Sequence, residues 1–345
     1  MSSRATSPPF FIVGVPRSGT TLLSVLLNGH SRLFLDKQAI AIRTLDFYRR
    51  VERSNRHNPG ARPPVRWKDE AARDERLVDF LNWPLLTENT DLTLGNFVER
   101  SFTARAATHG KEIFGDKSPD AVTRLPELLS LFPNARVIVV VRDARPNVLS
   151  LVRRQYLPLR VAAQRWKDWN AAAFAAREWL GPDRIHTLRY EDLLREPETT
   201  LRAVCSFLGV GYEPALLDLA AAPATRGSDA YVQPTLDPAA TERWKTNVAP
   251  ADRALIERSC GHWLMKLDYE VSPASAGNEE LGFWADYRLR VANAFRLVFR
   301  PKRKLMRDRR LQTVRVPLSE RLYVLLATVA GGLLRKELLD EYRRD

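Results

Sequence analysis

The feature that most constrains the fold is a short apolar run that leads into a loop containing glycine and proline. Residues 10–15 read FFIVGV, and residues 16–21 continue as PRSGTT. An apolar run that ends in Gly and Pro is typical of a buried strand followed by a tight loop. Four leucines within residues 18–27 then share one face of a predicted helix. The order strand, loop, helix is how a parallel α/β fold begins.

Further strands and helices alternate along the chain. Residues 136–141 (RVIVVV) are almost entirely Val and Ile, which indicates a strand buried on both faces, and residues 184–188 (RIHTL) form a third predicted strand. Helices are predicted over residues 119–131, 144–153, 162–180 and 197–208. This alternation predicts an α/β, three-layer fold in which helices flank a central parallel sheet. Residues 49–72 are polar and rich in Pro and Arg, so we expect a surface loop there.

Size and composition exclude several classes of protein. The chain has 345 residues, 45% of them hydrophobic and 28% charged, which supports a full core and excludes a wholly disordered chain. Its two cysteines, Cys205 and Cys260, form no disulfide framework, and no Cys/His cluster has zinc spacing. The longest apolar run, residues 322–334, is shorter than the ~20 residues of a membrane-spanning helix, and we see no secretory signal. The sequence therefore predicts a cytoplasmic protein.

The positive charge is concentrated near the C-terminus. The chain carries a net charge of +13, and residues 281–345 hold 16 Lys and Arg against 7 Asp and Glu, a net charge of +9. A charge of this sign predicts an anionic partner. Aromatic residues lie among the arginines of this segment, which favours peripheral contact with an anionic membrane surface. A site for a polyanionic acceptor and a solvated helix face stay open as alternatives. No base-reading motif is present, so we expect no nucleic acid partner.

The loop at residues 14–21 has the spacing of a phosphate-binding loop, G-x-x-x-x-G-K-[ST], with one departure. Thr20 stands where such loops carry the lysine that neutralises the β- and γ-phosphates. Gly14 and Gly19 still let the backbone close on an oxyanion, and the N-terminus of the following helix adds positive potential. Arg17 supplies a positive charge from within the loop. The sequence thus predicts an anion cradle of the P-loop NTPase-like type.

This segment, PRSGTTLL after a strand, resembles the 5′-phosphosulfate loop of the sulfotransferases. These enzymes use 3′-phosphoadenosine 5′-phosphosulfate (PAPS) and share a P-loop NTPase-like fold. The resemblance implies that PAPS is the sulfuryl donor, that 3′,5′-ADP is the product and that no metal is needed. It also implies that residues of the loop hold the 5′-phosphate. They are Pro16, Arg17, Ser18, Gly19, Thr20 and Thr21.

A second motif follows the predicted strand at residues 136–141. Arg142 comes directly after that strand, where open α/β sheets bind their ligands. Ser150 lies eight residues later, about two helical turns on, and Asp143 is a natural N-cap for the helix between them. The Arg and Ser at this spacing resemble the 3′-phosphate motif of the sulfotransferases. Because a 3′-phosphate distinguishes PAPS from ATP, this motif discriminates between the two nucleotides.

Later segments extend the resemblance. Tyr190, in the segment RYEDL, resembles a tyrosine that the family places near the 3′-phosphate. Ser228 and Arg243 lie in segments that resemble the late loop which closes over PAPS, with Arg243 in place of the family's lysine. The resemblance covers roughly residues 8–270 and is closest to the tyrosylprotein-like and bacterial branch. We therefore expect a PAPS-binding domain at residues 1–275 and a basic, helical C-terminal extension at residues 276–345.

Sulfuryl transfer needs a base for the acceptor proton and cations for the charge on the leaving group. Arg17 is predicted to serve the bridging oxygen, and Lys117 matches a lysine that the tyrosylprotein enzymes place near the sulfonate. Those enzymes carry a glutamate 21 residues after the loop arginine, where this chain has Gln38, which cannot accept a proton at neutral pH. Asp36 is therefore the preferred base, and Asp116 is the alternative.

Taken together, these motifs predict an enzyme that moves a sulfuryl group from PAPS to a hydroxyl or amine of a carbohydrate, lipid or protein acceptor. Two alternatives stay open. One is an ATP-dependent small-molecule kinase with a degenerate loop, which leaves Arg142 and Ser150 unexplained. The other is a non-catalytic nucleotide-binding scaffold, which Gln38 favours. His30, His109 and His186 are further base candidates, although a lone histidine is more often structural.

Overall fold

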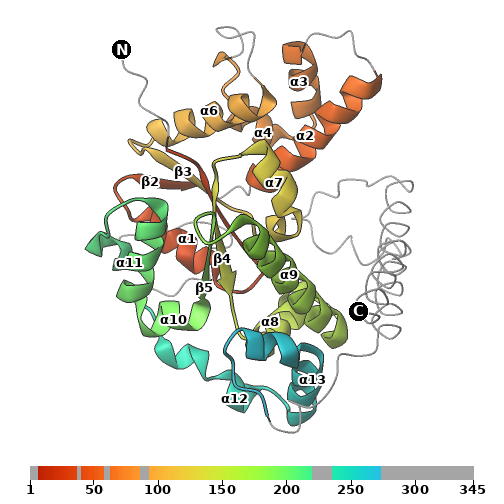
Figure 1. Ribbon diagram of the computed structural model, residues 1–345, viewed down its shortest axis with the longest axis vertical. Helices are drawn as coiled ribbons and strands as arrows, with labels where there is room; N and C mark the ends of the chain where they lie inside the picture. Colours follow the sequence, from red (N-terminus) through yellow and green to blue (C-terminus); the bar gives the residue numbers. More distant parts are fainter. Residues whose placement is uncertain (1–6, 37–39, 58–62, 86–92, 220–234, 273–345) are drawn as a thin grey trace.

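The computed structural model describes residues 7–36, 40–57, 63–85, 93–219 and 235–272, which form a three-layer α/β fold (Figure 1). Within these residues, parallel strands make one sheet in the order β2-β3-β1-β4-β5. The strands are β1 (Phe10–Gly14), β2 (Leu33–Asp36), β3 (Ile113–Lys117), β4 (Arg136–Val141) and β5 (Ile185–Arg189). Since β1 lies between β3 and β4, the chain leaves β1 toward one edge and later crosses to the other. Open parallel sheets bind ligands at such a switch point, beyond the carboxyl ends of the strands.

Alternate residues of the central strands supply two apolar cores. In β1, Phe11 and Val13 belong to one core, and Phe10 and Ile12 belong to the other. All four side chains are completely buried. A strand that is covered on both faces must be apolar throughout, which is why β1 and β4 read as continuous apolar runs.

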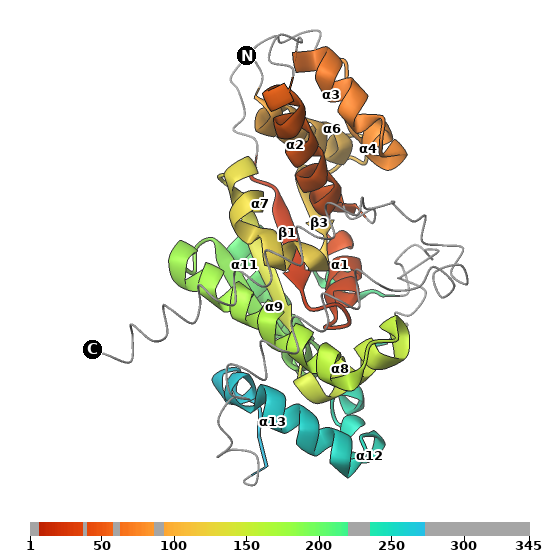
Figure 2. The ribbon, with the colours of Figure 1, turned by 90° about the vertical axis from the view of Figure 1, so that its right-hand side faces the viewer.

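Helices cover both faces of the sheet (Figures 1 and 2). The larger core is shared with α2 (Ile40–His57), α3 (Pro63–Ala71), α4 (Glu75–Phe80), α6 (Leu94–Ala107), α7 (Leu125–Leu131), α8 (Ala144–Gln155), α9 (Leu159–Leu180) and α13 (Pro250–Lys266). The other core is shared with α1 (Thr20–Asn28), α10 (Tyr190–Arg195), α11 (Pro197–Leu208) and η2 (Pro214–Leu217). Three short elements complete the described fold: η1 (Pro119–Arg124), η4 (Pro238–Thr241) and α12 (Trp244–Asn247). In both views α2 and α3 lie at one end of the molecule, and α12 and α13 lie at the other.

The structure corrects two of the predicted elements. Most of residues 49–72 are helical rather than a surface loop, because α2 continues to His57 and α3 occupies Pro63–Ala71. Two prolines are tolerated in the first turn of α3, and Trp67 and Ala71 bury an apolar face that the surrounding charges obscure in the sequence. Residues 119–131 are not one helix, since the 3₁₀ helix η1 precedes α7 and Pro126 lies in the first turn of α7.

Three further expectations concern the cysteines, membrane-spanning helices and the C-terminal segment. Cys205 and Cys260 are free thiols buried in the cores, as expected. Over the described residues, no helix is both long enough and apolar enough to cross a bilayer. The predicted extension at residues 276–345 lies outside the described residues, as do Gln38 and Ser228.

Candidate active site

The loop after β1 turns through three residues with positive φ. Gly14, Arg17 and Gly19 have φ values of 145°, 74° and 101°, and the N–H of Ser18 donates to the carbonyl three residues earlier over 3.1 Å. A Cβ at Gly14 would lie 2.4 Å from the carbonyl oxygen of Val140, so only glycine fits there. Arg17 adopts the left-handed region although it has a side chain, and strained backbone of this kind concentrates at functional sites.

Helix α1 points its positive end into this loop. Gly19 is its N-cap, and no side chain caps the first turn within the described residues. Ser18 is completely buried, and its Oγ has no hydrogen-bond partner in the described part of the chain. Backbone N–H groups at a helix N-terminus, together with a buried hydroxyl that lacks a partner, suit an anion. The loop and helix N-terminus that the sequence predicted are therefore present, and their binding of an anion stays a prediction.

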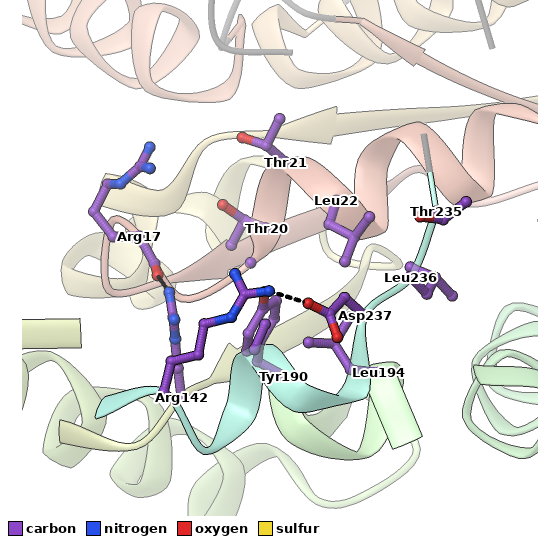
Figure 3. A pocket seen from close by; sticks show the side chains of 13 residues that line it. Arg17, Thr20, Thr21, Leu22, Arg142, Tyr190, Leu194, Thr235, Leu236 and Asp237 are labelled. Carbon is purple, nitrogen blue, oxygen red and sulfur yellow. Dashed lines mark hydrogen bonds and ion pairs between the residues drawn. The ribbon is translucent and has the colours of Figure 1, made fainter. Parts of the chain in front are cut away.

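The second motif comes directly against the first. Arg142 Nη1 donates to the carbonyl oxygen of Arg17 over 3.0 Å, and Arg17 Nε donates to Ser150 Oγ over 3.2 Å. The guanidinium of Arg142 also lies over the ring of Tyr190, 4.5 Å from its centre (Figure 3). A Cβ at Gly19 would lie 2.3 Å from that same ring. Five residues predicted from three separate segments thus meet at one edge of the sheet.

Two cavities open where these segments meet. The larger, of about 540 Å³, is lined by Arg17, Thr20, Thr21, Arg142 and Tyr190, and Asp237 and Leu236 close its far side (Figure 3). The smaller, of about 340 Å³, contains Ser150, and none of its described lining residues is acidic. Five arginines contribute to its lining: Arg17, Arg142, Arg153, Arg154 and Arg243. A guanidinium binds phosphate oxygens in a bidentate fork, so this cavity is suited to a phosphate.

The backbone around Arg142 is fixed from several sides. Trp166 of α9 donates its Nε1 hydrogen to the carbonyl oxygen of Arg142 over 2.9 Å. Asp143 caps α8 by accepting the N–H of Arg145 over 2.9 Å, as its N-cap position predicted. Its own N–H donates to Glu191 Oε1 over 3.1 Å, and burial raises the pKa of that carboxyl. Glu191 is therefore part of the frame that orients Arg142.

A model of the sulfotransferase family matches residues 8–214. The chain belongs to the sulfotransferase family. This assignment makes the protein a transferase, and both segments that the sequence predicted to bind anions fall within the matched residues.

Curated relatives agree with this assignment. The chain is 26% identical over 295 residues to protein-tyrosine sulfotransferase A of Caenorhabditis elegans, covering 80% of this chain and 71% of that protein. It is 26% identical to protein-tyrosine sulfotransferase 2 of Gallus gallus over 61% of this chain and 53% of the relative. It is 27% identical to protein-tyrosine sulfotransferase 1 of Danio rerio over 61% of this chain and 55% of that relative. The chain thus spans about half the length of the last two relatives.

Solved structures confirm the fold. The sulfotransferase domain from the curacin biosynthetic pathway superposes with a TM-score of 0.54 and 24% identity, covering 78% of this chain and all of that domain. The sulfotransferase domain of the Synechococcus PCC 7002 olefin synthase superposes with a TM-score of 0.54 and 20% identity. This match covers 79% of this chain and 99% of that domain. The expected P-loop NTPase-like, three-layer fold with a central parallel sheet is therefore correct.

In this sulfotransferase the candidate bases lie at the carboxyl ends of the edge strand β2 and of its neighbour β3. Asp36 ends β2 and is in register with Asp116 of β3, and Lys117 follows Asp116. Asp36 is only 5% exposed, and Arg105 Nε lies 3.9 Å from its Oδ2. Neither the two carboxylates nor Lys117 is among the described residues that line the two cavities. They share the carboxyl edge of the sheet with the cradle, and their assigned roles stay predictions.

Asp116 has a structural task. It is completely buried, and it accepts the first two N–H groups of α2, from Ile40 over 2.7 Å and from Ala41 over 3.2 Å. The hydroxyl of Ser118 donates to it over 2.6 Å. Burial raises the pKa of Asp116 to about 6, and the neighbouring charge of Asp36 adds to that rise. A carboxylate that caps a helix from a closed site is poorly placed to reach an acceptor.

The three histidines that the sequence offered as further base candidates differ in burial. His30 is buried, with Nε2 2.8 Å from the carbonyl oxygen of Gly211. His186 is half-buried and stacks on Phe207, and burial lowers its pKa. His109 is exposed and stacks on Phe34. The contacts of His30 and His186 are those of packing residues.

The sequence missed two cationic residues of the site. Arg153 and Arg154 line the smaller cavity, and Arg154 lies one helical turn after Ser150. The i, i+4 spacing was the available signal, because residues four apart share a helix face. Arg243, which the resemblance of its segment to the late loop had suggested, lines both cavities beside its ion-pair partner Asp237.

Proposed function

We propose that this sulfotransferase moves the sulfuryl group of PAPS to a hydroxyl or amine of an acceptor. One observation carries the proposal: hydrogen bonds join the loop at residues 14–21 to Arg142 and to Ser150, so that the two predicted anion sites adjoin at one edge of the sheet. PAPS carries a phosphosulfate at one end of its ribose and a phosphate at the other, so it needs two neighbouring anion sites. ATP has no 3′-phosphate and leaves the second site without a purpose.

The residues of the edge fit such a donor. Residues 16–21 are proposed to hold the 5′-phosphosulfate, and the buried hydroxyl of Ser18 and the Nε of Arg142 both lack a partner within the described residues. Arg142 and Ser150 are proposed to hold the 3′-phosphate, with Tyr190 beside them. Among the late-loop residues we keep Ser228 as a proposed contact from its sequence alone. Arg17 stands at the junction and serves both ends.

The proposed reaction is an in-line transfer. The acceptor oxygen or nitrogen attacks sulfur while the bond from sulfur to the bridging oxygen breaks, and 3′,5′-ADP leaves with that oxygen. Arg17 and Lys117 are proposed to stabilise the charge on the bridging oxygen and the sulfonate. Asp36 is proposed to take the acceptor proton, and the adjoining Arg105 keeps its environment polar. A tyrosine hydroxyl of a protein is one acceptor to test, because the curated relatives are named for it.

Thermal shift with two nucleotides, 3′,5′-ADP and ATP with Mg²⁺, separates this proposal from the two alternatives. We expect 3′,5′-ADP to raise the melting temperature and ATP with Mg²⁺ not to raise it. A ligand at 100 times its dissociation constant adds ~2.7 kcal/mol of stability, which is readily measured. Stabilisation by ATP with Mg²⁺ alone would indicate a kinase, and stabilisation by neither nucleotide would indicate a scaffold.

A further inference from the structure

Arg145 has no role in the proposed reaction, yet it is buried close to the donor site. It is the second residue of α8, three positions after Arg142, and only 2% of it is exposed. Its guanidinium donates to both carboxylate oxygens of Asp143, over 2.9 and 2.6 Å, and to Glu257 Oε1 of α13 over 2.8 Å. Two carboxylates therefore balance its charge, so Arg145 is not a ligand for a phosphate.

The flat face of this guanidinium carries an indole ring. Arg145 Cζ lies 3.9 Å from the centre of the Trp244 ring, and Arg253 Cζ lies 5.2 Å from it. The N–H groups of Arg145 that lie in its plane are used by the carboxylates, which leaves the face for stacking on the aromatic ring. Trp244 is 8% exposed and begins α12. The ion pairs thus build a rigid platform for one tryptophan.

Trp244 directly follows Arg243 in the chain. Arg243 lines both cavities, and Trp244 lines the smaller one. Arg243 is the N-cap of α12, and η4 ends two residues before it. Both elements are only one turn long, so their position depends on what they pack against. One attachment comes from Arg195 of α10, whose Nη2 donates to Glu242 Oε1 over 2.5 Å. The stack on Arg145 is a second attachment, on the side where α12 lies beside α8 and α13 (Figures 1 and 2).

We propose that Arg145 is a positioning residue of the donor site, which anchors Trp244 to α8 and α13 and thereby holds Arg243 at the two cavities. This inference rests on the proposed function, because it assigns Arg243 to the binding of the donor nucleotide. Arg145 then contributes to donor affinity without touching the donor. In a double-mutant cycle, the losses of donor affinity caused by substituting Arg145 and Arg243 should therefore not add.

Calorimetric titration with 3′,5′-ADP tests the proposal on four proteins: wild type, Arg145→Gln, Arg243→Ala and the double variant. We expect each single variant to bind about tenfold more weakly, and the double variant to bind no more weakly than the worse single one. Arg253→Gln is the matched control, since it also removes a cation that contacts Glu257 and the same ring, but from a greater distance and a more exposed position. We expect it to bind within about twofold of wild type.

Two results would overturn the proposal: an affinity of Arg145→Gln equal to that of wild type, or losses that multiply in the double variant. Arg145→Gln leaves Asp143 and Glu257 without their partner, and this variant could fail to fold for that reason. In that case, substitution of Trp244 tests the proposal instead. Trp244→Leu keeps the ion pairs, and we expect its loss of affinity to vanish in an Arg243→Ala background, with Trp244→Phe restoring binding. Independent losses there contradict the proposal. If wild type itself does not bind 3′,5′-ADP, the proposed function fails instead.

Discussion

Arg17 and Ser150 are 133 positions apart in the chain, yet Arg17 Nε donates to Ser150 Oγ over 3.2 Å. One residue comes from the loop after β1, and the other comes from α8 after β4. These strands are neighbours in the sheet, so their carboxyl ends deliver both motifs to the same edge. This contact joins the two proposed anion sites on which the proposed donor depends.

Replacement of Arg142 should weaken binding of the 3′-phosphate specifically. We expect Arg142→Ala to reduce affinity for 3′,5′-ADP about 10- to 100-fold, because a charged fork is lost, and to reduce affinity for 5′-AMP much less. Titration calorimetry measures both. Arg202→Ala is the control, since that side chain is exposed and pairs with Glu198 on α11. Equal losses for both nucleotides would remove Arg142 from the 3′-phosphate site.

A side chain at Gly19 should weaken nucleotide binding more than the backbone strain of a positive φ alone would. Gly19→Ala places a Cβ 2.3 Å from the ring of Tyr190, so that ring must move away from Arg142. We expect loss of detectable 3′,5′-ADP binding. Gly110→Ala is the matched control, because Gly110 also has positive φ but has open space around it. The control should lose about 1 kcal/mol of stability and keep its affinity. Normal binding by Gly19→Ala would show that Tyr190 and the loop need not touch.

The proposed base is tested by separating turnover from binding. Asp36→Asn keeps the size of a side chain that is 5% exposed, and it removes the proton acceptor. We expect turnover to fall at least about 100-fold while affinity for 3′,5′-ADP stays within about twofold. Turnover at the wild-type rate would transfer the role to another group, with Gln38 excluded by its chemistry.

Asp116 should give the protein a recognisable dependence of stability on pH. Its pKa is about 6 in the folded state, above the 3.8 of an unperturbed aspartate, because the carboxyl is completely buried. The folded state therefore binds the proton more tightly, and this group lowers the free energy of unfolding as pH rises from about 4 to about 6. A rise of about two pKa units corresponds to a loss of about 3 kcal/mol in the free energy of unfolding over this pH range.

Chemical denaturation of wild type and Asp116→Asn between pH 4 and pH 8 measures this contribution. The substitution also alters hydrogen bonds, and these changes add a difference in the free energy of unfolding between the two proteins that does not vary with pH. We expect the stability of wild type relative to the variant to fall up to about pH 6 and to stay level above pH 7. A difference that is constant over the whole range would mean that Asp116 is ionised normally in the fold.

The C-terminal extension carries a separate proposal. We propose that residues 276–345 hold the protein at an anionic membrane surface, because residues 281–345 combine a net charge of +9 with aromatic side chains. Full-length protein should pellet with vesicles that contain anionic phospholipid and not with neutral ones, and raised salt should release it. Equal pelleting of a chain that ends at residue 275 would contradict the proposal.

The parts of the fold that the sequence predicted are those governed by local rules. β1 and β4 are apolar on both faces, and Gly14 and Gly19 mark the turn from β1 into α1, where both have positive φ. Both signals are visible in short windows of sequence. β2 and β3 escaped prediction because they are short and end in Asp36 and in Asp116-Lys117. Their burial comes from neighbouring strands and from α2, which a local pattern does not contain.

The same distinction applies to the site. Arg17, Arg142 and Ser150 follow strands whose carboxyl ends must share an edge, so their meeting could be predicted. Arg243 was suggested only by the resemblance of its segment to the late loop. The stack of Trp244 on Arg145, by which we propose that Arg243 is held, joins residues about a hundred positions apart and depends on tertiary structure. Asp116 looked like a possible base in the sequence, and only the N–H groups of α2 reveal its capping role.

Transfer of label from ³⁵S-PAPS tests the central claim most directly. Purified protein is incubated with the labelled donor and a lysate of the organism that makes it, and incorporation is compared between wild type and Arg17→Ala. We predict label in an acceptor with wild type, with formation of 3′,5′-ADP, and at least about 100-fold less with the variant. Equal incorporation by the two proteins, or labelling from γ-³²P-ATP in place of PAPS, would contradict the account.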